Sequence, residues 1–414
     1  MKVPWTRWPA GTLLVLIGGL ALALELAIWQ GLKQHVGDDF PVFWQAGRNF
    51  TSGSPLYHGY FPDARPFKYP PFAALVFQPL GLLPLQVAAI LFSLLNLVLW
   101  ISAAILTRRI ICEYFPDRNT GRIPFLLALA FSAQFFLDNF HHAQMNGVIF
   151  MLVLLGIHAY LRRRDRSAAA YFVTATAIKI TPIFFVAWLL IRGRRRAVLA
   201  VPALVFACVV VPLLLRGPVT GARDLAEYYR SFLEPQQRAE ISTYSAGQNL
   251  AALVTRMTRP VEYFGDRSYR YLPTSERAAR LTYRVVWLIV LLVFLSKLLL
   301  LRWGHAVLSP LELSMVFVAG LLLSPITFTT HLVSLLFVFY AFLSTRLGAL
   351  TRTARVLAPV LFVGMAGIGL SGRDLVGSSV YLAVRGYSLI AWTLLLLFVT
   401  AVVVSRGSDE VSPT

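Results

Sequence analysis

Residues 83–107 read LPLQVAAILFSLLNLVLWISAAILT, and Arg108 and Arg109 follow at once. The stretch contains no charged side chain, and it is longer than the roughly 20 residues that a helix needs to cross about 30 Å of hydrocarbon. The bilayer core offers no water to the backbone, so a spanning segment of this kind must be helical. Residues 83–107 therefore predict a transmembrane helix.

Similar apolar segments recur along the chain. Of its 414 residues, 57% are hydrophobic and 14% are charged, whereas soluble domains are about 45–50% apolar and about 25% charged. This composition excludes an ordinary cytosolic enzyme and a disordered or fibrous chain. We predict an all-α, polytopic transmembrane bundle of about ten full spans. These spans are expected near residues 11–31, 83–107, 123–137, 147–161, 197–215, 281–301, 306–323, 332–345, 356–370 and 380–404.

Lysine and arginine are concentrated in alternate breaks between the spans. Seventeen of them lie in residues 108–122, 162–166, 192–196, 297–305 and 346–355. The intervening breaks, residues 138–146, 324–331 and 371–379, hold only Arg373. The positive-inside rule places the first set in the cytoplasm, together with both termini. The net charge of +19 is therefore a topology signal, and it predicts no nucleic-acid partner.

Residues 167–191 are flanked by basic clusters at both ends, and two interpretations remain open. A single crossing would move Arg192 and its neighbours outside and invert every later span. Two half-length helices with a break near Lys179-Ile180-Thr181-Pro182 would keep both clusters inside. Proline cannot continue helical hydrogen bonding cleanly, so we favour a broken or re-entrant helical hairpin.

This topology predicts one integral membrane domain over residues 1–404 and a short cytoplasmic tail over residues 405–414. Two long external loops are expected at residues 32–71 and 216–280. The first span resembles a signal peptide, but its apolar run continues through Trp29, so we expect it to stay uncleaved. The expected location is the cytoplasmic (inner) membrane. Cys112 and Cys208 lie in or next to apolar segments, as free packing thiols do.

The first external loop opens on two adjacent carboxylates, Asp38 and Asp39. Because adjacent carboxylates repel, one of them can titrate high and act as a base. Trp44, Tyr57 and Tyr69 add aromatic surface nearby. Aromatic rings beside carboxylates suit sugar binding, but hydrated helix ends and interfacial aromatic belts are the common structural alternatives.

Further polar residues are expected on the external side or at membrane depth. Residues 138–146 contain His141 and His142, whose adjacent positions do not match metal-ligand spacing, so hydrogen bonding or solvation is favoured. His331 follows the break at residues 324–331, and it can bind phosphate when protonated or donate a hydrogen bond when neutral. Lys179 and Glu312 lie within apolar runs, so each is either functional or a buried tie between helices.

In chain order, these landmarks resemble glycosyltransferase family 87, which comprises bacterial polyprenyl-phosphate-mannose-dependent mannosyltransferases in the glycosyltransferase C superfamily. The resemblance extends roughly from Asp39 to His331. Its elements are Asp39-Phe40, Phe43-Trp44, Ala46, Gly53, Pro55-Leu56-Tyr57, Tyr69-Pro70-Pro71, Pro79-Leu80, Gln144 with Asn146, Lys179 with Thr181-Pro182, Gln248-Asn249, and Ser324-Pro325 with His331.

The resemblance implies a glycosyltransferase C-like fold and an enzyme that moves a sugar, by default mannose, from a polyprenyl-phosphate sugar to a lipid- or glycan-linked acceptor. Asp39 would be the general base, with Asp38 as the alternative. His331, Lys68 and Lys179 would bind the donor phosphate on the outer face. The expected substrate-binding residues are Trp44, Tyr57, Tyr69, Gln144, Asn146, Gln248 and Asn249. No metal or other cofactor is expected, and membrane lipids are expected partners.

A membrane transporter or a lipid or glycolipid flippase is the competing interpretation. Broken helices and intramembrane lysine or glutamate are features of transporters. The sequence shows no paired inverted repeat, however, and transport leaves the aromatic and acidic loop unexplained. A polar site at one end of the bundle favours the enzyme, whereas a midplane site between two similar halves favours transport.

Overall fold

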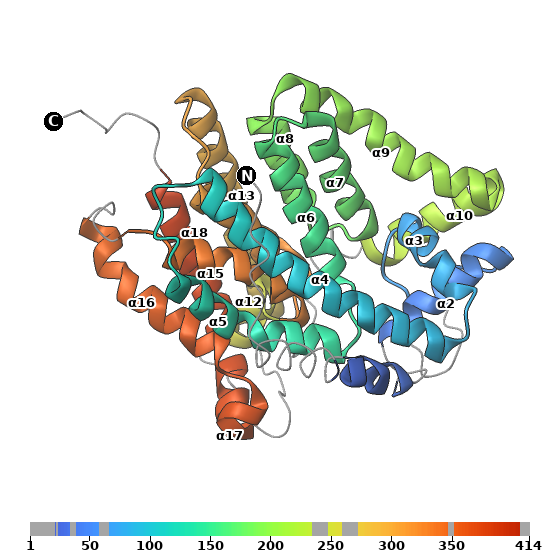
Figure 1. Ribbon diagram of the computed structural model, residues 1–414, viewed down its shortest axis with the longest axis horizontal. Coiled ribbons are helices and arrows are strands. Elements are labelled where there is room, and N and C mark those ends of the chain that lie inside the picture. The colour runs from blue at the N-terminus through green and yellow to red at the C-terminus, as the bar shows by residue number, and fades with distance from the viewer. Residues whose placement is uncertain are drawn as a thin grey trace, which may run out of the picture.

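The structure is a computed structural model that describes residues 21, 24–33, 39–57, 66–233, 247–258, 272–346 and 352–405. Every regular element within these residues is helical, as the apolar segments predict (Figure 1). Asp38, most of the first predicted span and all but the first residue of the predicted tail lie outside the described residues.

In the part of the chain that the structure describes, four helices are long and apolar enough to cross a membrane: α4 (Leu85–Tyr114), α5 (Arg122–His141), α9 (Arg195–Arg216) and α13 (Glu276–Trp303). A fifth span results if α16 (Arg352–Gly369) and α17 (Arg373–Gly386), which are bent by 111°, count as one. The chain is therefore a multi-pass membrane protein by these criteria. The expected number of about ten spans is not confirmed.

Shorter apolar helices occupy most of the remaining predicted spans. They are α3 (Pro71–Gly81), α6 (Asn146–Leu161), α8 (Ile183–Arg192), α14 (Pro310–Leu323), α18 (Leu389–Val404), and η2 (Thr329–Ser334) with α15 (Leu335–Leu343). Every residue of α14 is buried by other helices. A 14-residue helix is about 21 Å long, and one covered by protein needs no contact with lipid. High hydrophobicity therefore marks both lipid-facing and enclosed helices.

The predicted span over residues 380–404 is wrong as a single helix. Helix α17 ends at Gly386, and α18 begins at Leu389. Between them, Ser388 has a φ of 59°, in the left-handed region that interrupts a right-handed helix. The sequence carries a signal for this interruption, because Arg385 and Gly386 precede it at the end of α17.

The predicted break within residues 167–191 is present. Helix α7 (Asp165–Ile178) ends before Lys179, whose backbone is extended, and α8 begins after Pro182. The start of α7 lies close to the end of α8, because Arg194 Nε donates to Asp165 Oδ1 at 2.6 Å. Helices α6, α7 and α8 lie side by side (Figure 1). These features fit the hairpin and not the single crossing.

The short basic breaks gather at one end of the bundle, which we call the basic end. Arg162 Nε donates to Tyr114 Oη at 3.1 Å, which joins two of them. The backbone N–H of Asn119 donates to Ser344 O at 2.6 Å and connects the residues before α5 to the end of α15. A common end for these breaks is what the positive-inside rule requires.

Glu312 is a buried tie between helices at the basic end. Its side chain is 1% exposed and accepts hydrogen bonds from Trp188 Nε1 at 2.8 Å and Arg192 Nε at 2.9 Å. Arg192 also donates to the carbonyl oxygens of Leu301 and Ala306. One guanidinium therefore joins α8 to the end of α13 and the start of α14, and the structural interpretation of Glu312 is the appropriate one.

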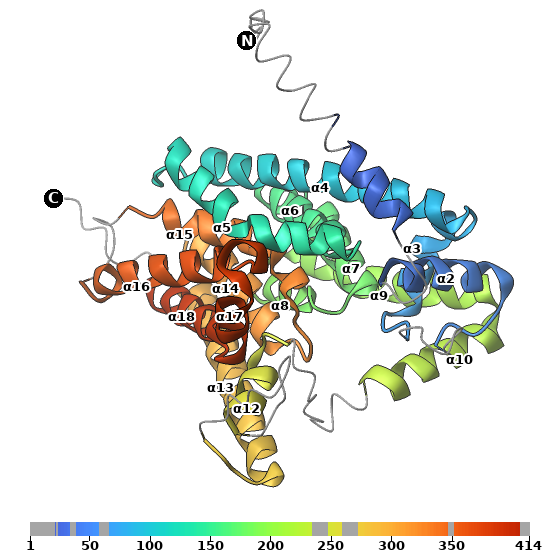
Figure 2. The same cartoon turned by 90° about the horizontal axis from the view of Figure 1, so that it is seen from below.

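The predicted external loops contain helices of their own. Helix α2 (Asp39–Ser52) lies in the first, while α10 (Pro218–Tyr228), η1 (Tyr229–Leu233) and α12 (Leu250–Thr258) lie in the second. Helices α2 and α3 pack beside α9 and α10 (Figure 2). A Cβ added to Gly47 would lie 2.3 Å from Phe77 O. Only glycine allows this approach, which fixes the position of α2 and its first residue.

Candidate active site

The candidate site lies where four chain segments meet near the end of α5. They are the start of α2, the turn between α5 and α6, the break between α7 and α8, and the one-turn helix η2. All four are helix ends or breaks, where backbone and side-chain polar groups are available to a ligand. Helix α5 has 20 residues, so this end is about 30 Å from its start at the basic end.

Lys179 is at the centre of the site. Its Nζ donates to Asn146 Oδ1 at 2.6 Å and lies 2.8 Å from His331 Nε2. The same nitrogen is 5.6 Å from the centroid of the Tyr69 ring. Lys179 is 8% exposed, and a buried amine needs such partners to offset lost hydration. The break at Pro182 allows this side chain to leave the helical hairpin and reach two other segments.

Asp39 supplies the negative charge of the site. It is the first residue of α2, where the helix dipole favours a carboxylate. Its charge interacts electrostatically with Lys179 and His142. Burial, and then the nearby Asp39 carboxylate, raise the pKa of the Tyr69 phenol. Asp39 is therefore close to a buried cation and to an aromatic ring.

His331 is buried beside Lys179. Burial, and then the adjacent Lys179 charge, hold the pKa of His331 well below its usual value of 6.5. His331 Nε2 lies 2.8 Å from Lys179 Nζ, and Nδ1 accepts from the Phe328 backbone N–H at 3.3 Å. Of the two roles that the sequence leaves open for His331, the lowered pKa favours the uncharged one.

Asp138 and His142 form a second charged pair beside the site. Nδ1 of His142 lies 3.4 Å from Asp138 Oδ1, and the hydroxyl of Thr329 donates to the same carboxylate. The hydrogen bond to Asp138 raises the pKa of His142 to about 9. Sequence reasoning did not identify this pair, although its four-residue spacing on one helix is a signal for it.

Two amide groups in the turn before α6 are buried with unused hydrogen-bonding capacity. The side-chain oxygen of Gln144 and the side-chain nitrogen of Asn146 have no hydrogen-bond partner among the described residues. One is an acceptor, the other is a donor, and the residues are 8% and 5% exposed. Such groups are costly unless a ligand satisfies them.

The other predicted site residues have mainly supporting contacts. Trp44 Nε1 donates to Leu83 O, and the Tyr57 hydroxyl donates to Tyr69 O, both at 2.9 Å. The backbone N–H of Gln248 donates to Thr327 O, and Asn249 Nδ2 donates to Ser324 O. The last two residues therefore anchor the segment that leads to His331. Lys68 is exposed and precedes Tyr69.

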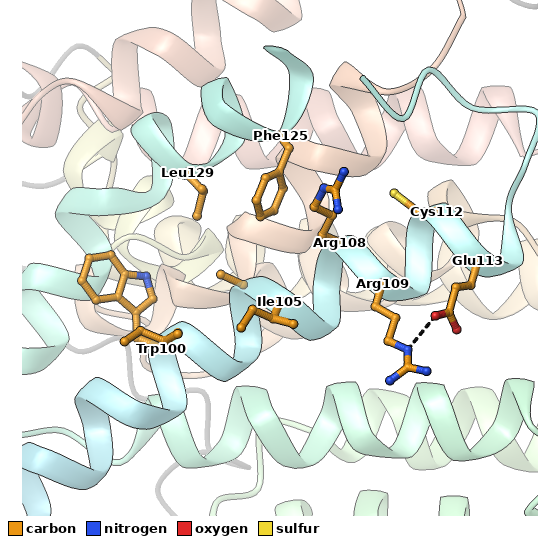
Figure 3. Close-up of a pocket in the computed structure, with 10 residues that line it drawn as sticks. Trp100, Ile105, Arg108, Arg109, Cys112, Glu113, Phe125 and Leu129 are labelled. Atoms are coloured by element: carbon orange, nitrogen blue, oxygen red, sulfur yellow. Dashed lines mark hydrogen bonds and ion pairs between the residues drawn. The ribbon is translucent and has the colours of Figure 1, made fainter. Parts of the chain in front are cut away.

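An apolar groove between α4 and α5 is separate from this site. It has a volume of about 490 Å³ and is lined by residues that include Trp100, Arg108 and Phe125 (Figure 3). Arg109 turns toward Glu113, with which it forms an ion pair of 2.7 Å (Figure 3). Arg108 and Phe125 place the groove at the basic end, so it does not belong to the Asp39 and Lys179 cluster.

A carboxylate, a buried amine and unsatisfied amide groups at one end of a membrane bundle define a site for a polar, anionic ligand. The sequence model of glycosyltransferase family 87 matches residues 67–325 of the chain. The chain belongs to glycosyltransferase family 87. The matched region includes Tyr69, Asn146 and Lys179, while Asp39 and His331 lie just outside it.

Three similar proteins are mycobacterial mannosyltransferases. A polyprenol-phosphate-mannose-dependent alpha-(1-2)-phosphatidylinositol mannoside mannosyltransferase of Mycobacterium tuberculosis is 28% identical over 225 residues, which cover 52% of this chain and 51% of that protein. The protein of the same description from Mycolicibacterium smegmatis is 27% identical over 238 residues, covering 53% and 52%. A phosphatidylinositol pentamannoside mannosyltransferase of M. tuberculosis is 28% identical over 225 residues, covering 52% and 49%.

The matched region thus spans about half the length of each of these relatives. No solved structure matches the chain.

Proposed function

We propose that this protein transfers a sugar, by default mannose, from a polyprenyl-phosphate sugar to a lipid- or glycan-linked acceptor at the outer face of the membrane. The convergence of Asp39, Asn146 and His331 around Lys179 carries the proposal. Family membership and the donor named for the three relatives agree with this class of reaction.

Asp39 is the proposed general base. Its carboxylate accepts the proton of an acceptor hydroxyl as that oxygen attacks the anomeric carbon of the donor sugar. The bond between the anomeric carbon and the phosphate oxygen breaks in the same displacement, which inverts the anomeric configuration. Proton removal by a positioned base contributes about 10²–10⁴-fold to rate. Asp38 remains the alternative base from the sequence.

Lys179 is the proposed partner of the leaving group. A phosphodiester becomes a monoester when polyprenyl phosphate departs, so negative charge grows on its oxygens. A cation that is already held in place stabilises this charge without reorganisation. The neutral His331 ring positions the Lys179 amine from one side, and Asn146 positions it from the other. Lys68 remains a peripheral candidate for the same phosphate.

The sugar is proposed to lie against the turn before α6. Sugar hydroxyls both donate and accept hydrogen bonds, which matches the unsatisfied Gln144 oxygen and Asn146 nitrogen. The Tyr69 ring supplies the aromatic surface on the same side of Lys179. This assignment accounts for the two amide atoms that have no hydrogen-bond partner among the described residues.

A lipid-linked donor suits the location of the site. The cluster lies at the far end of α5 from the basic end, which the positive-inside rule assigns to the cytoplasm. Nucleotide sugars are made in the cytoplasm, so a site on the outer face needs a donor that is soluble in the membrane. Positions at one end of the bundle also favour the enzyme over a midplane transport site.

The test is transfer of labelled mannose from polyprenyl-phosphate-mannose by purified protein in detergent, with a membrane lipid extract as acceptor. Wild type is compared with Asp39→Asn and with Asp374→Asn, a matched change at an exposed aspartate of α17. We expect product from wild type and Asp374→Asn, and a loss of at least about 10²-fold in Asp39→Asn with unchanged thermal stability.

Two results would count against the proposal in different ways. Full activity of Asp39→Asn would remove Asp39 as the base and leave the reaction class standing. If wild type gave no product from polyprenyl-phosphate-mannose or from any other polyprenyl-phosphate sugar, the reaction class itself would be wrong.

A further inference from the structure

A large cavity lies at the basic end, on the opposite side of the molecule from the candidate active site. Its volume is about 1,090 Å³. It is lined by residues 118–121 before α5, the start of α14, the end of α15, residues 355–365 of α16 and the end of α18. These helix ends all belong to the face that the positive-inside rule assigns to the cytoplasm. The cavity therefore opens at the membrane interface and not at the sugar-transfer site.

The rim of the cavity is cationic. Arg118, Arg346 and Arg355 line it, and none of its described lining residues is acidic. Asp117 directly precedes Arg118 in the sequence, and its carboxylate interacts electrostatically with the Arg118 guanidinium. Arg118 is also held by a hydrogen bond to the Thr345 hydroxyl. The rim thus combines one fixed guanidinium with two exposed ones, which suits an anion of low charge.

The deeper walls are apolar. Phe342 and Leu343 contribute from α15, and Leu361, Phe362 and Met365 contribute from α16. From Arg355 to Met365, α16 rises about 15 Å, which is about half of the hydrocarbon thickness. A ligand that fills the cavity must therefore carry a negative charge at one end and a long apolar part at the other.

One buried polar atom inside the cavity has no partner. Thr400 of α18 lines it and is 3% exposed, and its hydroxyl has no hydrogen-bond partner within the described part of the chain. Thr400 lies one helical turn deeper than Val404, which lines the cavity near the end of α18. A polar group of the ligand is thus expected just below its charged end.

We propose that this cavity is a binding site for an anionic glycerophospholipid. Its phosphodiester lies among Arg118, Arg346 and Arg355, an ester oxygen accepts from the Thr400 hydroxyl, and an acyl chain follows α16 toward Met365. Basic pockets between membrane helices on the cytoplasmic side hold anionic head groups in this way. The order of arginines, polar atom and apolar wall matches the order of groups along such a lipid.

The groove between α4 and α5 differs from this cavity in the charge of its lining. In that groove, Arg109 is neutralised by Glu113, and the Arg108 guanidinium lies 5.9 Å from the Phe125 ring (Figure 3). The groove has one arginine free of a carboxylate, whereas the larger cavity has three basic groups on its rim. Charge therefore distinguishes the two, and Arg109 provides a matched control.

The test measures lipid binding by native mass spectrometry of the full chain in a neutral detergent. The probes are phosphatidylglycerol, phosphatidylcholine with the same acyl chains, and glycerol phosphate without acyl chains. The variants are Arg346→Gln with Arg355→Gln, Thr400→Val, and Ala358→Phe, which narrows the cavity while keeping its charges. The control is Arg109→Gln with Arg166→Gln, which removes the same charge elsewhere at the basic end. Thermal unfolding of each variant verifies that it folds.

We expect phosphatidylglycerol to bind more tightly than phosphatidylcholine and glycerol phosphate not to bind measurably. The double arginine variant is expected to weaken phosphatidylglycerol binding by about 25-fold, at about fivefold for each arginine. Thr400→Val is expected to weaken it by about two- to tenfold. Ala358→Phe is expected to weaken it by narrowing the cavity, while the control variant binds as wild type does.

Equal binding of both phospholipids, or an equal loss in the control and in the double arginine variant, would overturn the proposal. So would full binding by Ala358→Phe. Glycerol phosphate that bound as well as phosphatidylglycerol would show a site for a soluble anion instead.

Discussion

Lys179 and His331 are 152 positions apart in the chain and share a hydrogen bond of 2.8 Å. The first is at the break of a helical hairpin, and the second is in a one-turn helix that precedes α15. Burial, and then the adjacent Lys179 charge, hold the pKa of the imidazole well below its usual value. The contact between Lys179 and His331 holds the Lys179 amine where the hairpin break and helix η2 lie near Asp39.

Replacing Lys179 is expected to remove the cation that stabilises the leaving phosphate. For Lys179→Met, we expect kcat to fall by about 10²–10³-fold, the range for loss of one group that stabilises transition-state charge. Lys179→Arg should recover part of this loss because the charge is kept. Labelled-sugar transfer measures each rate. The matched control is Lys297→Met in α13, away from the candidate site, and an equal loss in that variant would contradict the assignment.

His331 is expected to make the protein less stable in acid. Its pKa is below the value of about 6.5 that it has when unfolded, so the unfolded chain binds a proton first as the pH falls. The stabilisation by the neutral ring is therefore complete above pH 6.5 and decreases below it. Thermal unfolding between pH 5 and 7.5 should show a steeper fall for wild type than for His331→Gln. Parallel curves would mean that the ring titrates normally.

His142 is expected to act in the opposite direction. Its pKa is raised to about 9 by Asp138, so the folded chain holds a proton that the unfolded chain has released. The contribution of this ion pair is fully present below pH 6.5 and is lost as the pH rises through about 9. Wild type should therefore lose stability between pH 7 and 9.5 relative to His142→Gln. The partly exposed position makes the effect small.

Glu312→Gln is expected to destabilise the protein by about 3–5 kcal/mol, because it leaves the buried Arg192 guanidinium without its carboxylate. The matched control is Glu276→Gln, since Glu276 forms an exposed pair with Arg280, and such pairs contribute about 0–1 kcal/mol. Thermal or denaturant unfolding in detergent compares the two. Similar values for both variants would show that the tie between α8 and α14 is not a stabilising contact.

The helical class and the hairpin break were predictable because they depend on local chemistry. Charge-free apolar runs indicate helices, and Pro182 between two basic clusters indicates a break. The interruption at Ser388 was missed, although Arg385 and Gly386 precede it and are typical of a helix end. The enclosure of α14 was equally hidden, since a helix buried by protein and a helix buried by lipid have the same composition.

For the site, the sequence identified residues but not their partners. Asp39, Tyr69, Asn146 and Lys179 were expected on one face, and the structure brings them together with His331. Hydrogen bonds to backbone carbonyls are invisible in a sequence, so the supporting contacts of Trp44, Tyr57 and Asn249 could not be foreseen. The pair of Asp138 and His142 was not predicted, although its four-residue spacing indicates such a pair.

Two contacts of the hairpin can form only late in synthesis, because their partners lie far apart in the chain. These contacts join Arg192 to Glu312 and Lys179 to His331. Glu312 is 120 residues after Arg192, and His331 is 152 residues after Lys179. At about 5–20 residues per second, the ribosome needs about 8–30 s to make the second interval. Lys179 can bind Asn146, which precedes it in the chain, but it meets His331 only after residue 331 has been made. The burial of this pair must therefore wait for the last third of the polypeptide, so the candidate site is completed late.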